Sequence, residues 1–148
     1  MKIAVYTIAK NEEQFVERWA ESCKDADYRF ILDTGSTDKT VELARAAGVE
    51  VAIASISPWR FDDARNISLG LLPADIDICI ALDMDEVLVP GWREELEKIE
   101  PETTRPRYQY TWSWNGDEPG LQYGGDKIHR RHGYRWKHPV HEVLVTDR

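Results

Sequence analysis

The sequence predicts an α/β fold with a mostly parallel central sheet and a small antiparallel element in its C-terminal part. Segments of apolar, β-branched composition alternate with segments of helical spacing through the first two-thirds of the 148 residues. Strands and helices that alternate in this way form parallel sheets with right-handed crossovers. The last third instead alternates aromatic or apolar residues with polar ones at a period of two. The length and the absence of internal repeats predict a single domain over residues 1–148.

The first half of the chain supplies two strand–helix pairs. Residues 2–8 are apolar and β-branched, which predicts the first strand, and apolar residues recur at helical spacing over 15–23. Asn11 is the predicted N-cap of this helix, since asparagine side chains accept hydrogen bonds from the N–H groups of a first turn. Residues 29–32 are the predicted second strand. The helix after it is predicted to end at Gly48, because glycine favours the left-handed conformation past a helix end.

Two further strands and one helix complete the predicted parallel sheet. The third strand is predicted over residues 49–53 and the fourth over 76–82, both from their apolar composition. Between them, residues 61–72 have a helical pattern with Asp62 as the predicted cap. The side of this helix that we expect to be buried carries Ala64, Ile67, Ser68 and Leu71.

The last third predicts shorter elements. A short helix is expected to open at Pro90 and to end near Ile99, since proline is favoured at the first helical position. Residues 107–114 alternate like a strand, and residues 143–145 are the predicted final strand. The segment 127–138 contains many basic residues and no carboxylate. It predicts either a site for one anionic ligand or a solvated loop.

Composition excludes several classes of protein. The formal net charge of −8 argues against a protein that coats nucleic acid. No apolar stretch is long enough to span a bilayer, so stable membrane insertion is not expected. The N-terminus has no signal-peptide pattern, and Cys23 and Cys79 are too few for a disulfide framework or a zinc site. We therefore expect a cytoplasmic protein with two buried thiols.

The predicted fourth strand ends in three carboxylates within four positions. Strand residues alternate sides, so Asp83 and Asp85 can project from one face while Met84 points away. Two such carboxylates repel each other unless a cation lies between them. Hard divalent ions such as Mn²⁺ or Mg²⁺ prefer oxygen ligands and complete their coordination with water and substrate phosphates. The motif predicts a metal site, with a solvated acidic turn as the alternative for an isolated Asp-x-Asp.

Polar side chains follow every predicted parallel strand. Residues 9–12 follow the first strand, Asp33 ends the second, residues 58–66 follow the third and Asp83 follows the fourth. Ligands of such sheets bind outside the carboxyl ends of the strands. Asp33 is suited to a ribose hydroxyl or a base edge. Together these strand ends predict a nucleotide pocket with a metal at its far side.

Four segments, in this order, resemble the successive motifs of glycosyltransferase family 2. They are Thr7–Glu13, Asp33–Thr40, Phe61–Asn66 and Leu82–Glu86, and a closing Val140-His141-Glu142 resembles the C-terminal element of one branch. The resemblance implies a GT-A fold with a Rossmann-type central sheet. It further implies an inverting, metal-dependent transfer from a nucleotide-sugar donor, UDP-hexose before others, to an acceptor that the sequence does not identify. Mn²⁺ is the implied metal, with Mg²⁺ as the second choice.

The resemblance also implies which residues bind the donor. Asp33 and Asp63 are implied near the nucleoside, and Arg65 is implied to hold the donor. Arg131 is a candidate phosphate ligand from the basic segment. Trp136 is a candidate platform for a sugar ring, with core packing as an equal alternative. The full set assigned to donor binding is Ala9, Asn11, Glu12, Asp33, Asp63, Arg65, Asp83, Met84, Arg131 and Trp136.

Metal binding and proton transfer are the remaining roles. The implied metal ligands are Asp83, Asp85 and His141, and the rival histidines are His129, His132 and His138. An inverting transfer needs a base for the acceptor hydroxyl, and we favour Glu142 over Asp126, ahead of Asp117 and Glu118. Adjacent residues of an extended segment point to opposite faces. His141 and Glu142 can therefore share one pocket only where the backbone bends.

Two other functions are consistent with parts of the sequence. Residues 83–88 also match the motif of haloacid dehalogenase-like phosphatases, in which Asp83 would be the nucleophile and Asp85 the acid/base. That motif normally ends the first strand, whereas here it ends the fourth. The second alternative is a non-catalytic nucleotide-sugar-binding module, which would bind UDP and Mn²⁺ but release neither sugar nor UDP from a donor.

Overall fold

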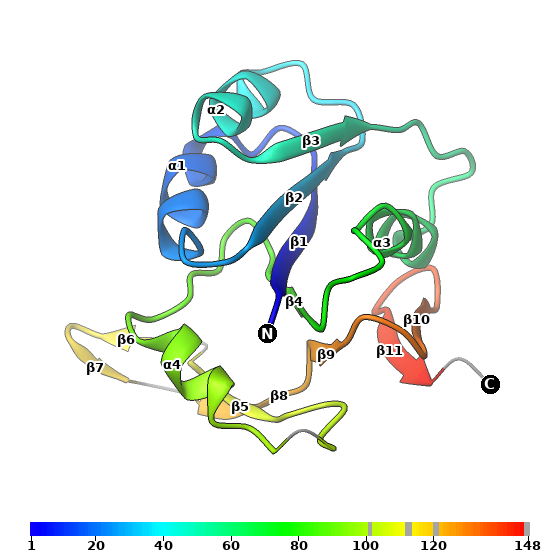
Figure 1. Cartoon of the computed structure of the whole chain (residues 1–148). Coiled ribbons are helices and arrows are strands. Elements are labelled where there is room, and N and C mark those ends of the chain that lie inside the picture. The colour runs from blue at the N-terminus through cyan, green and yellow to red at the C-terminus, as the bar shows by residue number, and fades with distance from the viewer. Residues whose placement is uncertain (101, 112–113, 120–121, 147–148) are drawn as a thin grey trace.

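A five-stranded sheet forms the centre of the molecule (Figure 1). The structure, a computed structural model, describes residues 1–100, 102–111, 114–119 and 122–146. Four strands run parallel in the order β3-β2-β1-β4, and β9 pairs with β4 in the antiparallel direction. The predicted α/β fold with a mostly parallel sheet is confirmed. The bounds are β1 Ile3–Ala9, β2 Tyr28–Asp33, β3 Glu50–Ile53, β4 Ile78–Ala81 and β9 Ile128–Arg130.

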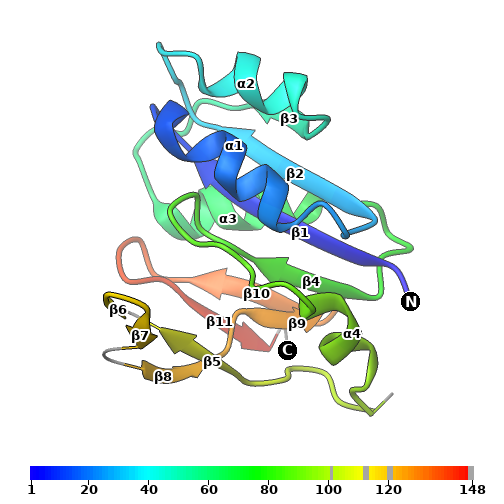
Figure 2. The same cartoon turned by 90° about the vertical axis from the view of Figure 1, so that its left-hand side faces the viewer.

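Helices and a hairpin cover the two faces of the sheet. Helices α1, α2 and α4 pack on one face, and α3 packs on the other beside the antiparallel hairpin of β10 and β11 (Figure 1). Figure 2 shows α1 lying over β1 and β2. Within the described residues no helix has the length and apolar content needed to cross a bilayer. The bounds are α1 Glu13–Ser22, α2 Thr40–Ala46, α3 Phe61–Gly70, α4 Trp92–Glu97, β10 Tyr134–Lys137 and β11 Val143–Thr146.

Strand β1 supports both faces because its side chains alternate. Ile3 and Val5 pack toward α1, whereas Ala4 and Tyr6 pack toward α3 and the hairpin, and all four are fully buried. We call the two layers the helix-side core (α1, α2 and α4) and the hairpin-side core (α3, β10 and β11). Full burial of a large apolar side chain contributes about 1.5–3 kcal/mol, so each core holds its cover firmly on the sheet.

The C-terminal third contains the expected antiparallel elements and, among the described residues, four strands that the sequence did not predict. β5 (Tyr108–Thr111) pairs with β8 (Gln122–Gly125), and β6 (Trp114–Asn115) pairs with β7 (Glu118–Pro119). The predicted strand over 107–114 is thus divided between β5 and β6, and its residues 112–113 lie outside the described residues. The predicted final strand is confirmed as β11. The basic segment is not a solvated loop, since it forms β9 and β10.

Helix α3 differs from its prediction in its cap and in its buried face. The N-cap is Arg60, and Asp62 lies in the first turn, where its Oδ1 accepts hydrogen bonds from Arg60 Nε at 3.0 Å and from the Asp63 N–H at 2.9 Å. Ala64 and Ser68 are buried as expected, but Ile67 and Leu71 are exposed. The helix is rotated from the predicted orientation because it packs on both the sheet and the hairpin. Its buried residues are Asp62, Ala64, Arg65, Ser68 and Leu69.

His129 is a core residue rather than a metal ligand. It is fully buried on β9, with Nε2 at 2.8 Å from the Tyr6 hydroxyl and Nδ1 at 2.7 Å from the Arg130 carbonyl oxygen. Burial lowers the pKa of His129 to about 4. The histidine is therefore neutral at physiological pH.

Acid should destabilise the folded chain through His129. The pKa is about 4 in the folded state and 6.5 when unperturbed, so the unfolded state takes up the proton first as the pH falls. The contribution of His129 to the free energy of unfolding is therefore complete above pH 6.5 and decreases as the pH falls to 4. The total loss is at most about 3 kcal/mol. Urea unfolding of the wild type and of His129→Gln at neutral and at mildly acidic pH measures this contribution. The wild-type advantage should shrink in acid, and an advantage that does not change with pH would contradict the assignment.

Candidate active site

The carboxyl ends of three neighbouring strands meet at one edge of the sheet. β1 ends at Ala9, β2 at Asp33 and β4 at Ala81, and the three strands are parallel. A hydrogen bond joins the loops that follow β1 and β2: the Ala9 carbonyl oxygen accepts from the Thr34 N–H at 2.9 Å. Ligands of parallel sheets bind at this edge. The loops after these strands are therefore the candidate site.

Asn11 ties the first two loops together and does not cap α1. Its backbone has a φ of +53°, and its N–H donates to Ser36 Oγ at 2.8 Å. Its Oδ1 accepts hydrogen bonds from the N–H groups of Thr37 at 2.7 Å and Asp38 at 3.3 Å. The N-cap position belongs to Glu12, whose side chain makes no capping bond. The predicted cap is wrong because asparagine tolerates the left-handed conformation, which turns its side chain to the neighbouring loop.

Asp33 shapes the turn that follows β2. Its side chain is buried, and its Oδ2 accepts hydrogen bonds from the N–H groups of Gly35 at 3.1 Å and Ser36 at 2.8 Å. The Ser36 hydroxyl donates to Oδ1. Gly35 has a φ of +123°, a conformation that glycine adopts without strain. Asp33 thus lies where the sequence predicts the nucleoside, with its carboxylate bonded to its own loop.

A buried arginine joins the acidic motif to the C-terminal segment. Arg65 on α3 donates from Nη2 to Asp83 Oδ1 at 2.7 Å and from Nε to Glu142 Oε1 at 2.8 Å. Its guanidinium carbon lies 5.1 Å from the centroid of the Trp136 ring. Nη1 is buried and has no hydrogen-bond partner among the described residues. Three segments that are distant in sequence meet at this one side chain.

Two cations neutralise Asp83. Besides Arg65, Lys127 Nζ lies 3.3 Å from Asp83 Oδ2. Burial acts to raise the pKa of Asp83, but the charges of Arg65 and Lys127 outweigh it, so the pKa is lowered. The sequence predicted Arg131 of the basic segment as a phosphate ligand and did not single out Lys127. The feature that could have identified Lys127 is its position as the first residue of the basic segment, directly before β9.

Carboxylates crowd around the motif. Glu12 is half-buried, and burial, followed by the charges of Asp85 and Asp83, raises its pKa to about 7. Glu86 also has a raised pKa, from burial and from the charge of Asp83, although its Oε1 accepts the Asp83 N–H at 2.8 Å. A bound cation would relieve this repulsion. The chemistry of these donors therefore fits a hard divalent ion.

The same residues suit an ion that is shared with a substrate rather than enclosed by the protein. Asp85 is exposed, and its carbonyl oxygen accepts a hydrogen bond from Arg18 Nη2 at 3.0 Å, which fixes the backbone. One or two carboxylates, with phosphate oxygens and water, suffice for Mg²⁺ and similar ions. Among the described residues no three His, Cys, Asp or Glu side chains are arranged to hold a metal. The structure thus does not assemble His141 with Asp83 and Asp85 as the sequence predicts.

A small cavity lies beside Asp83. Its volume is about 140 Å³. Tyr108 packs so closely on Gly125 that a Cβ there would lie 2.2 Å from the tyrosine ring, which explains the need for glycine. The cavity presents carboxylates, phenols and one amine, groups that bind hydroxyl-bearing ligands. Its lining residues are Asp83, Glu86, Tyr108, Tyr110, Gly124, Gly125, Asp126 and Lys127.

Arg131 lies away from this site. Because β9 is antiparallel to β4, Arg131 lies next to the start of β4, at the opposite edge of the sheet. Its guanidinium donates hydrogen bonds to the carbonyl oxygens of Leu72 and Pro73. His132 bonds nearby to the Ala74 carbonyl. A larger cavity of about 320 Å³ lies here, but it is remote from the acidic motif. The prediction that Arg131 binds the donor phosphates is therefore not met by its position.

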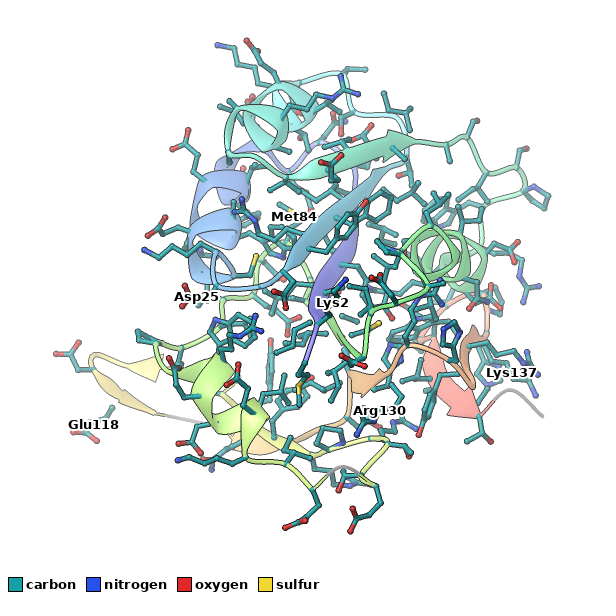
Figure 3. All side chains as sticks on the ribbon, in the orientation of Figure 1. Lys2, Asp25, Met84, Glu118, Arg130 and Lys137 are labelled. Atoms are coloured by element: carbon teal, nitrogen blue, oxygen red, sulfur yellow. The ribbon has the colours of Figure 1, made fainter. Side chains whose placement is uncertain are left out.

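Three other residues assigned to the donor have clear positions. Met84 is buried in the helix-side core, as Figure 3 shows, so its side chain is not part of the site. Trp136 is 2% exposed, which matches the packing alternative and excludes a platform for a sugar ring. The Asp63 side chain is 53% exposed in the first turn of α3, 4.0 Å from Arg60 Nε.

The candidate bases differ in their surroundings. His141 has a φ of +53°, so the backbone bends there, and the Glu142 side chain turns inward to Arg65 while His141 stays exposed. Asp126 lies in the wall of the small cavity, half-exposed, with Arg105 Nη2 at 3.0 Å. Figure 3 shows Glu118 on the β6–β7 hairpin, which projects from the body of the molecule. The two candidates on that hairpin are exposed: Asp117 and Glu118.

Known proteins resemble most of this chain. A family model described as glycosyl transferase family 2 matches residues 4–139. An uncharacterized glycosyltransferase of Rickettsia bellii is 32% identical over 108 residues, which cover 72% of this chain and 35% of the relative. A TPR repeat-containing protein of Synechococcus elongatus is 27% identical over 149 residues, 99% of this chain and 36% of the relative. The chain spans about a third of the length of these curated relatives.

Solved structures share the fold. Glucosyl-3-phosphoglycerate synthase of Mycobacterium tuberculosis in complex with UDP matches with a TM-score of 0.50 and 30% identity, over 58% of this chain and 34% of that chain. TarS of Staphylococcus aureus in complex with UDP-GlcNAc matches with a TM-score of 0.54 and 17% identity, over 66% and 30% of the two chains. At that identity the TarS likeness shows the fold alone. The GT-A-like, Rossmann-type architecture is confirmed.

Proposed function

Since this chain belongs to glycosyl transferase family 2, we propose that it contains the donor site of a metal-dependent, inverting glycosyltransferase that uses a nucleotide-sugar. The observation that carries the proposal is the network in which Arg65 joins Asp83 to Glu142 at the carboxyl edge of the sheet. It brings an acidic metal motif and a further carboxylate to one buried cation. Transfer of a sugar from a diphosphate needs groups of these kinds in one place.

The nucleoside is proposed to lie against the two tied loops. Ala9, Asn11 and Asp33 fix the shape of these loops, and the exposed carboxylate of Asp63 lies at the start of α3. The related synthase of M. tuberculosis was solved with UDP, which supports a uridine nucleotide. Its name includes a glucosyl group, which supports a hexose as the donor sugar.

The diphosphate is proposed to be held by Asp83 and Asp85 through Mn²⁺, with Mg²⁺ as the second choice. When bound, such an ion stabilises the charge of the leaving diphosphate as a Lewis acid. The crowding that raises the pKa of Glu12 supports a cation at this place. Lys127, whose side chain is one-third exposed beside Asp83, is the protein's own donor for phosphate oxygens.

Glu142 is the proposed base, with Asp126 as the second candidate. Arg65 Nε bonds to Oε1 of Glu142 and so fixes the direction of the carboxylate. Among the described residues no group bonds to Oε2, which would take the proton of the acceptor hydroxyl as the anomeric carbon is attacked. The acceptor itself stays unidentified.

Turnover distinguishes this proposal from its alternatives. The chain should release UDP from UDP-glucose in Mn²⁺, lose this activity in EDTA and recover it when Mn²⁺ is restored. A phosphatase of the haloacid dehalogenase type would instead release inorganic phosphate from a phosphomonoester. A binding module would take up UDP and Mn²⁺ in calorimetry without turnover. Activity that persists in EDTA would contradict the metal, and phosphate release would contradict the reaction.

A further inference from the structure

A line of buried hydrogen bonds lies beneath Arg65. The Trp136 Nε1–H donates to the Tyr6 hydroxyl at 3.0 Å, and that hydroxyl lies 2.8 Å from Nε2 of His129. Nδ1 of His129 lies 2.7 Å from the Arg130 carbonyl oxygen. The three side chains are at most 2% exposed, so water does not compete for these bonds.

The direction of each bond follows from the chemistry of its groups. An indole nitrogen only donates, so the Tyr6 oxygen accepts from Trp136. The single hydroxyl proton of Tyr6 then goes to Nε2 of His129. The remaining ring proton of a neutral His129 is on Nδ1 and donates to the Arg130 carbonyl. Only this placement of the protons satisfies the hydrogen-bonding groups of Trp136, Tyr6 and His129. The bond to Tyr6 fixes the rotation of the Trp136 ring.

The backbone of Trp136 is clamped as well. Asn66 Oδ1 accepts the Trp136 N–H at 2.7 Å, and Asn66 Nδ2 donates to the Trp136 carbonyl oxygen at 2.9 Å. Asn66 is the neighbour of Arg65 on α3. The clamp therefore holds β10 against the turn of α3 that carries Arg65, and the indole stands 5.1 Å from the guanidinium carbon.

Arg65 needs this support because its hydrogen bonds hold one edge of the guanidinium. Nε and Nη2 point to the same side and bind Glu142 and Asp83, whereas Nη1 has no partner among the described residues. A planar group that is bonded along one edge is free to pivot about that edge. The face of Trp136 opposes this motion and also attracts the cation.

We propose that Tyr6 is a positioning residue of the transfer reaction: by orienting Trp136 it holds the Arg65 guanidinium, and thereby the placement of Asp83 and Glu142. Tyr6 is fully buried, so its side chain is out of reach of a ligand that binds at the surface. The catalytic meaning of the inference rests on the proposed function. The coupling from Tyr6 to Arg65 is a property of the fold alone, so the two can be tested separately.

Tyr6→Phe tests the proposal because it keeps the ring and removes the hydroxyl that joins Trp136 to His129. We expect kcat for UDP-glucose hydrolysis to fall about tenfold while the donor KM stays within about twofold, since a misplaced catalytic group slows the chemical step. In ¹⁵N NMR spectra the Arg65 Nε–H signal should shift and exchange faster with water. Ile3→Val is the matched control: Ile3 is equally buried but lies in the helix-side core, so neither kcat nor the Arg65 signal should change.

The two measurements separate the outcomes. An Arg65 signal that is the same in Tyr6→Phe and wild type would overturn the proposal, whatever the activity. So would a shifted signal with an unchanged kcat, or an equal loss of kcat in Ile3→Val, which would indicate a general effect of core stability. If the wild-type chain hydrolyses no donor, the proposed function fails, and the NMR comparison still decides whether Tyr6 positions Arg65.

Discussion

Replacing Arg65 with methionine should destabilise the folded chain by about 3 kcal/mol and eliminate turnover of the nucleotide-sugar donor. The side chain is 7% exposed and bonds to two carboxylates, so its loss leaves Asp83 and Glu142 without their common partner. Breaking a buried ion pair from one side costs about 3–5 kcal/mol. We expect the low end of that range because Asp83 is one-third exposed and keeps Lys127. The midpoint of urea unfolding and the rate of UDP release measure the two effects.

Arg60→Met is the matched control for Arg65→Met. Arg60 precedes the same helix and is also ion-paired, with Asp62, but its own side chain is 45% exposed. The Asp62 side chain is only 9% exposed, but it keeps the hydrogen bond from the Asp63 N–H, so Arg60→Met should lower the urea midpoint by less than Arg65→Met does. Equal midpoints for the two variants would show that Arg65 is not the buried centre of the network. Full turnover by folded Arg65→Met would remove it from the donor site.

Asp85→Asn should lower donor hydrolysis by about a thousandfold while the fold stays intact. The carboxylate is exposed, and the group of Asp85 that supports the structure is its carbonyl oxygen, which the substitution retains. A metal that stabilises transition-state charge contributes several kcal/mol, which corresponds to about three powers of ten in rate. Mn²⁺ calorimetry should show weaker binding. The pKa of Glu12 should fall toward its ordinary value, because the charge of Asp85 is one cause of its rise.

Asp25→Asn is the matched control for Asp85→Asn. Asp25 is likewise exposed, and its carbonyl oxygen likewise accepts a hydrogen bond from an arginine, Arg93, at 2.7 Å. Figure 3 shows it beyond the end of α1, and it precedes β2, so it lies at the amino edge of the sheet. Hydrolysis and Mn²⁺ binding should match the wild type. If Asp85→Asn retained Mn²⁺-dependent turnover, the proposed role of Asp85 as a metal ligand would be wrong.

The parallel half of the fold was predictable because its signals are local. Apolar strands such as 2–8 and 76–82 alternate with amphipathic helices, and each feature lies within a few residues of sequence. The strands β9 and β10 were missed because charge hides their alternation. His129 and Trp136 face the core, while Arg135 and Lys137 on the other face of β10 are exposed, so a half-buried strand has the composition of a basic loop.

The candidate site could be predicted only where its residues are close in sequence. Asp83 and Asp85 lie within three positions of each other, so the sequence alone indicates an acidic pair. Their place directly after an apolar strand predicts that the pair lies at the carboxyl edge of the sheet. Nothing local indicates that Arg65 meets Glu142, because that contact depends on how the β10–β11 hairpin packs on α3. Asn11 illustrates the same limit: a helix cap and a staple between loops have the same local sequence, and the backbone conformation decides between them.

The division of β1 between two cores has a consequence for protein engineering. Residues that support Arg65 come from the hairpin-side core, whereas Ile3, Val5 and their neighbours on α1 belong to the helix-side core and do not contact the network. The support of the Arg65 guanidinium therefore comes from one face of β1, and the other face packs with the core that contains Met84 of the acidic motif. Stabilising substitutions in the helix-side core can be combined with changes around Arg65 if they preserve Met84 and the bonds from Arg18 to the Asp85 carbonyl and from Trp19 to the Leu82 carbonyl, which hold the acidic motif in place.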